Sequence, residues 1–88
     1  TYRYFKQNGH EFTIHALNRV EGQKTGKGKT LFTRDDVQGI LSQAANYRQP
    51  DGKQVYFQNN IAVIRATDTG EVVSVVSRDN PKKDWTVI

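Results

Sequence analysis

The sequence predicts a single α+β domain in which two N-terminal helices pack on one face of a twisted, four-stranded antiparallel sheet. The prediction depends on a change of pattern. In the first half of the chain apolar residues recur with a helical period, whereas after Pro50-Asp51-Gly52 they fall in short aromatic and β-branched runs separated by turn residues. A chain of 88 residues is long enough for one modest core and too short for a second domain. Helices followed by a run of antiparallel strands form a sandwich with the helices on one face of the sheet.

The N-terminal part of the chain predicts one helix and one cationic loop. Tyr2-Arg3-Tyr4-Phe5 alternates aromatic and basic residues, which favours a short edge strand or an ordered tail. Thr13 is a suitable N-cap for a helix from about Ile14 to Glu21. The stretch from Gly22 to Thr30 contains no apolar residue, so we expect it either to grip an RNA backbone or to be a solvated linker. It is not a Walker loop, because the glycine-to-lysine spacing differs and a helix precedes it. Its lysines are Lys24, Lys27 and Lys29.

A second helix is predicted from its cap and its apolar stripe. Thr33 and Asp36 have the spacing of a capping box, and Asp35 adds negative charge at the positive end of the helix dipole. Gly39 costs this helix about 1 kcal/mol, which close packing can offset. The stripe that packs on the core comprises Val37, Ile40, Leu41, Ala44 and Ala45.

The C-terminal half reads as a strand meander with tight turns at Asn59-Asn60 and Asp68-Thr69-Gly70. We expect the sheet face turned away from the helices to be open and lined by polar and aromatic residues, so that a ligand would lie there beside the cationic loop. The four predicted strands cover Gln54 to Gln58, Ile61 to Ala66, Glu71 to Ser77 and Asp84 to Ile88.

Composition limits the partners and the cofactors. The chain has 13 Lys and Arg against 9 Asp and Glu, a net charge of +4, which favours a nucleic acid, an anionic membrane surface or an acidic protein as partner. The absence of cysteine removes disulfides and thiolate chemistry. His10 and His15 do not have the spacing of a zinc site, so we expect no metal and no other cofactor. No run approaches the roughly 20 apolar residues of a membrane span.

His15 and Arg19 form the most suggestive pair in the chain. They stand four residues apart, so on a helix they project from one face. A histidine can move a proton near neutral pH, and an arginine beside it can hold a phosphate in a bidentate grip. In a small basic chain this pair points to RNA. The alternative, that His15 is a partly buried packing residue, stays open on sequence grounds.

Several short motifs together resemble a known family. The chain has His-Ala-x-x-Arg after a Phe-Thr step, then a second capped amphipathic helix, then strands ending in Gly-x-Val-Val-x-Val. From about Gly9 to Ile88 it resembles the small ribonuclease toxins of the barnase/EndoU/colicin D/RelE superfold. The resemblance implies helices followed by a twisted antiparallel sheet, and metal-independent cleavage of tRNA or another RNA. One departure is the long Gly22 to Thr30 stretch, where the family commonly has a compact arginine-rich turn, and it leaves the choice of substrate open.

The resemblance also implies a biological setting. Such domains commonly form the C-terminal ends of polymorphic and contact-dependent growth inhibition toxins of bacteria. We therefore expect residues 1–88 to be a single toxin domain from the C-terminal end of a larger protein, as the opening Thr1 without a methionine also suggests. It would be delivered from the surface of the producing cell or secreted, and would act in the cytoplasm of the target bacterium. A cognate, acidic immunity protein would neutralise it by covering the active-site cleft.

The resemblance places His15 as the imidazole of the first helix, Arg19 as its neighbour and Trp85 as a late-strand tryptophan of the colicin D type. RNA supplies its own nucleophile in the 2′-OH, so such an enzyme needs a base, cations around the phosphate, an acid for the 5′ oxygen and a surface for the base. His15 can be base or acid, Arg19 and Arg78 can stabilise the added charge, and Tyr56 or Trp85 can stack a nucleobase.

Each of the later residues has a structural alternative. Arg78 can bridge Asp79 or Asp84 at the surface, and Tyr56 and Trp85 can be core residues. Ser77 and Thr86 are further candidate hydroxyl donors to phosphate. Lys82 and Lys83 form either a solvated turn or an RNA contact.

Two other classes of function remain open. The first is a non-catalytic basic module that grips RNA or DNA through the lysine loop and the aromatic strands, and the second is an adaptor for an acidic protein. If the chain is a nuclease, its few aromatic residues can read only a few nucleotides, which favours a folded substrate with an exposed loop. We therefore expect tRNA cleavage at one site, in the anticodon loop or at the acceptor end.

Overall fold

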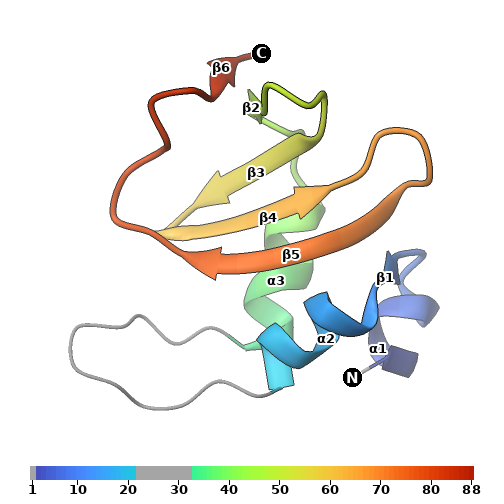
Figure 1. Ribbon diagram of the computed structural model, residues 1–88. Coiled ribbons are helices and arrows are strands. Elements are labelled where there is room, and N and C mark those ends of the chain that lie inside the picture. The colour runs from blue at the N-terminus through green and yellow to red at the C-terminus, as the bar shows by residue number, and fades with distance from the viewer. Residues whose placement is uncertain (1, 22–32) are drawn as a thin grey trace.

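The computed structural model describes residues 2–21 and 33–88. The predicted loop from Gly22 to Thr30, with Lys24, Lys27 and Lys29, lies outside the described residues. Three helices lie in the N-terminal half of the described chain, and five of its six strands follow them (Figure 1). In chain order the elements are α1 (Tyr2–Gln7), β1 (Glu11–Phe12), α2 (Ile14–Glu21), α3 (Arg34–Leu41), β2 (Tyr47–Arg48), β3 (Gln54–Gln58), β4 (Ile61–Arg65), β5 (Glu71–Ser77) and β6 (Thr86–Val87).

The sheet confirms the α+β class, with the helices packed on it, but is larger than predicted. Its strand order is β1-β5-β4-β3-β2-β6, and β1 pairs with β5 in parallel while every other neighbouring pair is antiparallel. The prediction of a four-stranded, purely antiparallel sheet is therefore wrong in detail. The additional strands β1 and β2 have two residues each, too few to show any alternation in the sequence. Of the predicted final strand, only Thr86–Val87 is paired.

The first residues form a helix, not the predicted edge strand or tail. Burial explains the difference, because Phe5 is 1% exposed and its ring stacks on that of Phe12 at 3.9 Å between centroids, with 14° between the planes. The Tyr4 hydroxyl also donates to the Asp35 carboxylate on α3 at 2.7 Å. These contacts lie far apart in the sequence, so the local alternation of aromatic and basic residues does not reveal them.

The main core lies between the helices and one face of the sheet. All three helices contribute buried side chains to it, and so do β3, β4 and β5. On β4 the core residues Ile61 and Val63 alternate, as the 2-residue period of a strand requires, whereas on β5 an irregularity in the pairing separates Val72 and Val75 by three positions. The contacts of α2 are mostly with β5, and those of α3 are with β3 and β4. The buried members are Phe5, Phe12, Ala16, Val20, Val37, Ile40, Leu41, Tyr56, Ile61, Val63, Val72 and Val75.

The other face of the sheet is partly covered, although the sequence predicted an open face. The segment after β5 returns across it and buries Trp85, which is 7% exposed, against Val55 and Ala62. The return is fixed by backbone hydrogen bonds from Trp85 to Lys82 at 3.1 Å and from Ile88 to Asn46 at 3.2 Å. Figure 1 shows this C-terminal segment ending at β6, at the far edge of the sheet from β1.

The predicted capping box at the start of α3 is confirmed. The Thr33 hydroxyl accepts from the Asp36 amide at 3.1 Å, and the Asp36 carboxylate accepts from the Thr33 amide at 2.8 Å. The helix ends earlier than the apolar stripe suggested, at Leu41, with Ser42 as its C-cap. Ala44 and Ala45 therefore lie beyond the helix.

We expect Thr33→Ala to lower the free energy of unfolding by about 1 kcal/mol, because it removes one half of this capping box. The urea midpoint of the full chain, followed by circular dichroism, measures the change. Thr33→Ser keeps the hydroxyl and should stay close to the parent chain. An unchanged midpoint in Thr33→Ala would contradict the role assigned to the cap.

Candidate active site

Helix α2 presents His15 and Arg19 to solvent. Thr13 starts the helix, since its hydroxyl accepts from the Ala16 amide at 3.1 Å and its carbonyl accepts from the Leu17 amide at 3.0 Å. Ala16 and Val20 turn inward against the core and are 0% and 8% exposed. Because these two residues fix the rotation of the helix, the side chains of His15 and Arg19 are exposed on its outer surface.

The exposure of His15 excludes its interpretation as a partly buried packing residue. Among residues 2–21 and 33–88, neither His15 nor Arg19 makes a hydrogen bond or an ion pair with another described residue. An imidazole and a guanidinium on adjacent turns of one helix are therefore both available to a ligand. Together they offer a proton acceptor and a group that can hold a phosphate.

Arg78 and Trp85 come together on the opposite face of the sheet. The Arg78 guanidinium lies 5.7 Å from the centre of the Trp85 ring, within the range of a cation–π contact. Its Nε also donates to the Asn80 carbonyl at 3.0 Å, which holds the side chain in its own loop. The Trp85 ring has Tyr47 and Phe57 as aromatic neighbours, at 5.9 Å and 6.2 Å between centroids. Trp85 is thus mainly a core residue of the second face, with one side approached by a cation.

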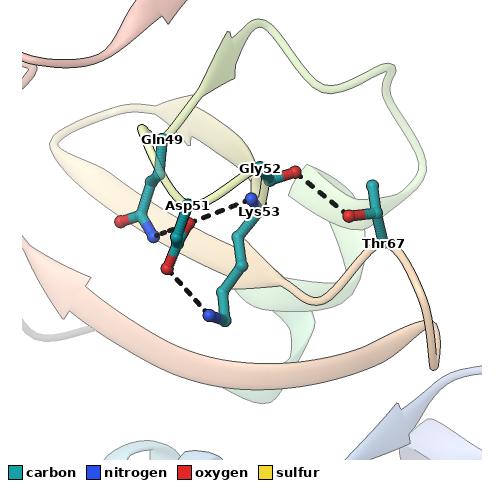
Figure 2. Close-up of polar contacts among 5 residues, drawn as sticks. All are labelled: Gln49, Asp51, Gly52, Lys53 and Thr67. Atoms are coloured by element: carbon teal, nitrogen blue, oxygen red, sulfur yellow. Dashed lines mark hydrogen bonds and ion pairs between the residues drawn. The ribbon is translucent and has the colours of Figure 1, made fainter.

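An open hollow of about 270 Å³ lies beside Trp85. One wall is the turn between β2 and β3, which Figure 2 shows held by polar contacts within the turn and by one contact to Thr67, between β4 and β5. The Lys53 ammonium bonds the Asp51 carboxylate at 2.8 Å, and the Gly52 carbonyl accepts from the Thr67 hydroxyl at 3.0 Å. The Lys53 side chain and backbone amide hold the pKa of Asp51 at about 2. The residues that line the hollow are Gln49, Pro50, Asp51, Lys82, Asp84 and Trp85.

The remaining predicted site residues lie in three different settings. Tyr56 is 7% exposed and belongs to the core under the helices. Lys82 and Lys83 are exposed in the loop before β6, and Thr86 is exposed on that strand. Lys24, Lys27 and Lys29 lie outside the described residues.

The predicted site residues therefore do not form one site, because they lie on two different faces of the sheet. His15 and Arg19 stand on α2, which packs on the helix-covered face, whereas Arg78 and Trp85 stand on the other face. Tyr56 and Trp85 belong to different core clusters, on opposite faces of the sheet. Within the described residues no hydrogen bond, ion pair or ring contact joins the α2 pair to Arg78, Tyr56 or Trp85. The α2 pair is thus the candidate catalytic group, and the Arg78–Trp85 group is a separate surface.

The sequence analysis did not identify a polar cluster beneath the helices. Arg65 ends β4, and its Nη1 lies 3.4 Å from the Tyr56 hydroxyl. His10 Nε2 lies 3.4 Å from the side-chain nitrogen of Gln38 on α3. The sequence does contain a signal for Arg65, since it continues the alternate series begun by the buried Ile61 and Val63 and so falls on the core-facing side of its strand.

Among residues 2–21 and 33–88 no group of three or more His, Asp or Glu side chains could hold a metal ion. In the same residues, no helix is both long enough and apolar enough to cross a membrane.

Comparisons with known proteins found no match to this chain among family models, curated proteins or solved structures.

Proposed function

We propose that this domain is a metal-independent endoribonuclease whose catalytic group is His15 with Arg19. The observation that supports this most directly is the exposure of both side chains on adjacent turns of α2, with no described partner to occupy them. The net charge of +4 adds a general attraction for RNA.

The proposed reaction uses the substrate's own hydroxyl. His15 accepts the proton of the 2′-OH, and the 2′ oxygen attacks the adjacent phosphorus. Arg19 stabilises the additional negative charge on the phosphate oxygens. The bond from phosphorus to the 5′ oxygen breaks, and that oxygen takes up a proton from solvent. The products are a 2′,3′-cyclic phosphate and a 5′-hydroxyl.

The proposed substrate is a folded RNA with an exposed loop, most simply tRNA. In the toxin setting that the resemblance implies, the domain acts in the cytoplasm of a target bacterium after delivery from another cell. Its partner there is an acidic immunity protein that covers His15 and Arg19. The exposed outer surface of α2 would be the part of the domain that such a protein has to cover.

The test is incubation of the purified chain with total tRNA in excess EDTA, followed by denaturing electrophoresis. We expect discrete fragments from cleavage at one site, and not general degradation of the tRNA. RNA that is retarded on a native gel but stays whole would favour the non-catalytic binding module. Cleavage that requires added magnesium would contradict the mechanism.

A further inference from the structure

A polar cluster of two side-chain contacts lies beneath the helices, and one of these contacts joins the segment before β1 to α3. His10 lies in that segment, Gln38 is on α3, Arg65 is on β4 and Tyr56 is on β3. His10 Nε2 and the Gln38 side-chain nitrogen are 3.4 Å apart. Arg65 donates to the Gly70 carbonyl at 2.8 Å, and its Nη1 lies 3.4 Å from the Tyr56 hydroxyl. The His10–Gln38 contact thus connects the N-terminal segment to α3, and the positive charge of Arg65 acts on His10 without a hydrogen bond between them.

The surroundings of His10 favour a neutral imidazole. His10 Nδ1 and Gln38 Oε1 are buried and have no hydrogen-bond partner in the part of the chain that the structure describes. The Gln38 amide nitrogen can only donate, so the neutral ring accepts at Nε2 and carries its one proton on Nδ1. An imidazolium carries a proton on both ring nitrogens, so protonation would place a second donor at Nε2, facing the Gln38 donor, and would break this contact. It would also add a second positive charge beside Arg65. Burial first, and the Arg65 charge second, lower the pKa of His10 below its ordinary value.

His10 also lies between α1 and β1, the two elements of the N-terminal segment that pack on the rest of the domain. Its backbone amide donates to the Phe5 carbonyl at 2.9 Å, which ties it to the end of α1. On its other side, β1 pairs with β5, and the Thr13 amide donates to the Val72 carbonyl at 2.9 Å. Phe5 and Phe12 are buried only while this segment stays in place. A change at His10 therefore acts directly on the docking of α1 and β1.

We propose that His10 is a pH-sensitive latch, whose neutral side chain holds α1 and β1 against α3 and whose protonation weakens that docking. The groups that act on it are Gln38 from α3, which is neutral, and Arg65 from β4, which is positive and has the Tyr56 hydroxyl of β3 at 3.4 Å from its Nη1. On its own segment the charged pair is Lys6 with Glu11, 2.9 Å apart and about half exposed. No carboxylate among the described residues bonds the imidazole, so none offsets its positive charge.

The direction of the pH effect follows from linkage. The released segment binds the proton of His10 more readily than the docked segment, because the docked pKa is the lower one. The docking free energy is complete above the ordinary pKa of 6.5, falls as the pH drops through that value, and levels off below the docked pKa. For each unit between the two pKa values, the docking equilibrium changes by about tenfold.

Hydrogen exchange of the full chain tests this proposal. We expect the amides of residues 5–13 to lose protection between about pH 7.5 and pH 5, after correction for intrinsic exchange, by about tenfold per unit of pKa difference. The amides of β3 and β4 should keep their protection over the same range. Loss of protection that is uniform over the whole domain would overturn a local latch.

Three variants and one nuclear magnetic resonance titration assign the effect to His10. His10→Gln should remove the pH dependence of residues 5–13, whereas His15→Gln, which changes the exposed histidine, should leave it intact. Arg65→Gln should raise the His10 titration midpoint, because it removes the neighbouring positive charge. If His10→Gln or Arg65→Gln fails to fold, a nuclear magnetic resonance titration of the unmodified chain decides alone: a His10 midpoint at or above 6.5 overturns the proposal.

Discussion

His15→Gln should lower RNA cleavage by at least about 100-fold, because a positioned acid–base group contributes about 10² to 10⁴ to such a rate. The substitution removes the proton acceptor but touches nothing in the core, since the side chain is exposed on α2. The urea midpoint and the affinity for uncleaved RNA should therefore stay near those of the parent chain. Initial rates on one tRNA, measured in excess EDTA, give the comparison.

Asn18→Ala is the matched control for His15→Gln. Asn18 lies on the same helix and is also exposed, but it can neither accept the 2′-OH proton nor carry charge. Its cleavage rate should fall within about threefold of the parent rate. Equal rates in His15→Gln and the parent chain would remove His15 from the reaction. A loss in both variants would point to the helix surface as a binding site and not to the imidazole.

Trp85→Ala should lower the free energy of unfolding by about 3–5 kcal/mol, the usual cost of emptying a buried aromatic site. The ring is 7% exposed and packs on Val55 and Ala62, with Tyr47 and Phe57 beside it. Trp85→Phe keeps an aromatic ring in the same site and should cost clearly less. Urea unfolding followed by circular dichroism measures both variants, since it does not depend on tryptophan fluorescence.

The Trp85 variants also separate the two roles considered for this residue. If Trp85 is a core residue, Trp85→Phe keeps both the fold and the cleavage rate. If Trp85 instead serves mainly to stack a nucleobase, Trp85→Ala will remain stable while its RNA affinity falls by about 1–3 kcal/mol. A stable Trp85→Ala chain would thus contradict the packing that the structure shows.

The elements predicted correctly are those whose signals are local. The second helix follows from the Thr33 capping box and its apolar stripe, and three strands follow from runs of five to seven residues. The turn at Asn59 and Asn60 follows from their tolerance of positive φ, and both residues adopt it, at 51° and 65°. In each case the information lies within a few neighbouring residues.

The elements missed depend on distant contacts. Strand β1 exists because residues 11 and 12 lie beside Glu71 and Val72 in parallel, and α1 is held by the stacking of Phe5 on Phe12. Neither pairing leaves a period in the local sequence. The burial of Trp85 likewise depends on the path of the segment that follows β5.

In the candidate site, too, the features with a local sequence signal could be predicted, and those that depend on distant contacts could not. The four-residue spacing of His15 and Arg19 is enough to predict that they share one face of a helix. The burial of Ala16 and Val20 in the structure then shows that this face is turned outward. The sequence does not reveal that Arg78 and Trp85 stand on the opposite face, because that depends on which face each strand and the final segment cover. Nor does a single histidine before a two-residue strand indicate the cluster around His10.

The chemical nature of the RNA ends tests the central claim most directly. After incubation of tRNA with the purified chain in excess EDTA, mass spectrometry of the 5′ fragment should show a 2′,3′-cyclic phosphate, and the 3′ fragment should begin with a 5′-hydroxyl. The same RNA carrying a 2′-O-methyl group at the cleaved nucleotide should stay intact, because it lacks the attacking hydroxyl. A 5′-phosphate at the new end, or cleavage of the methylated RNA, would contradict the assignment of the reaction to His15, Arg19 and the 2′-OH.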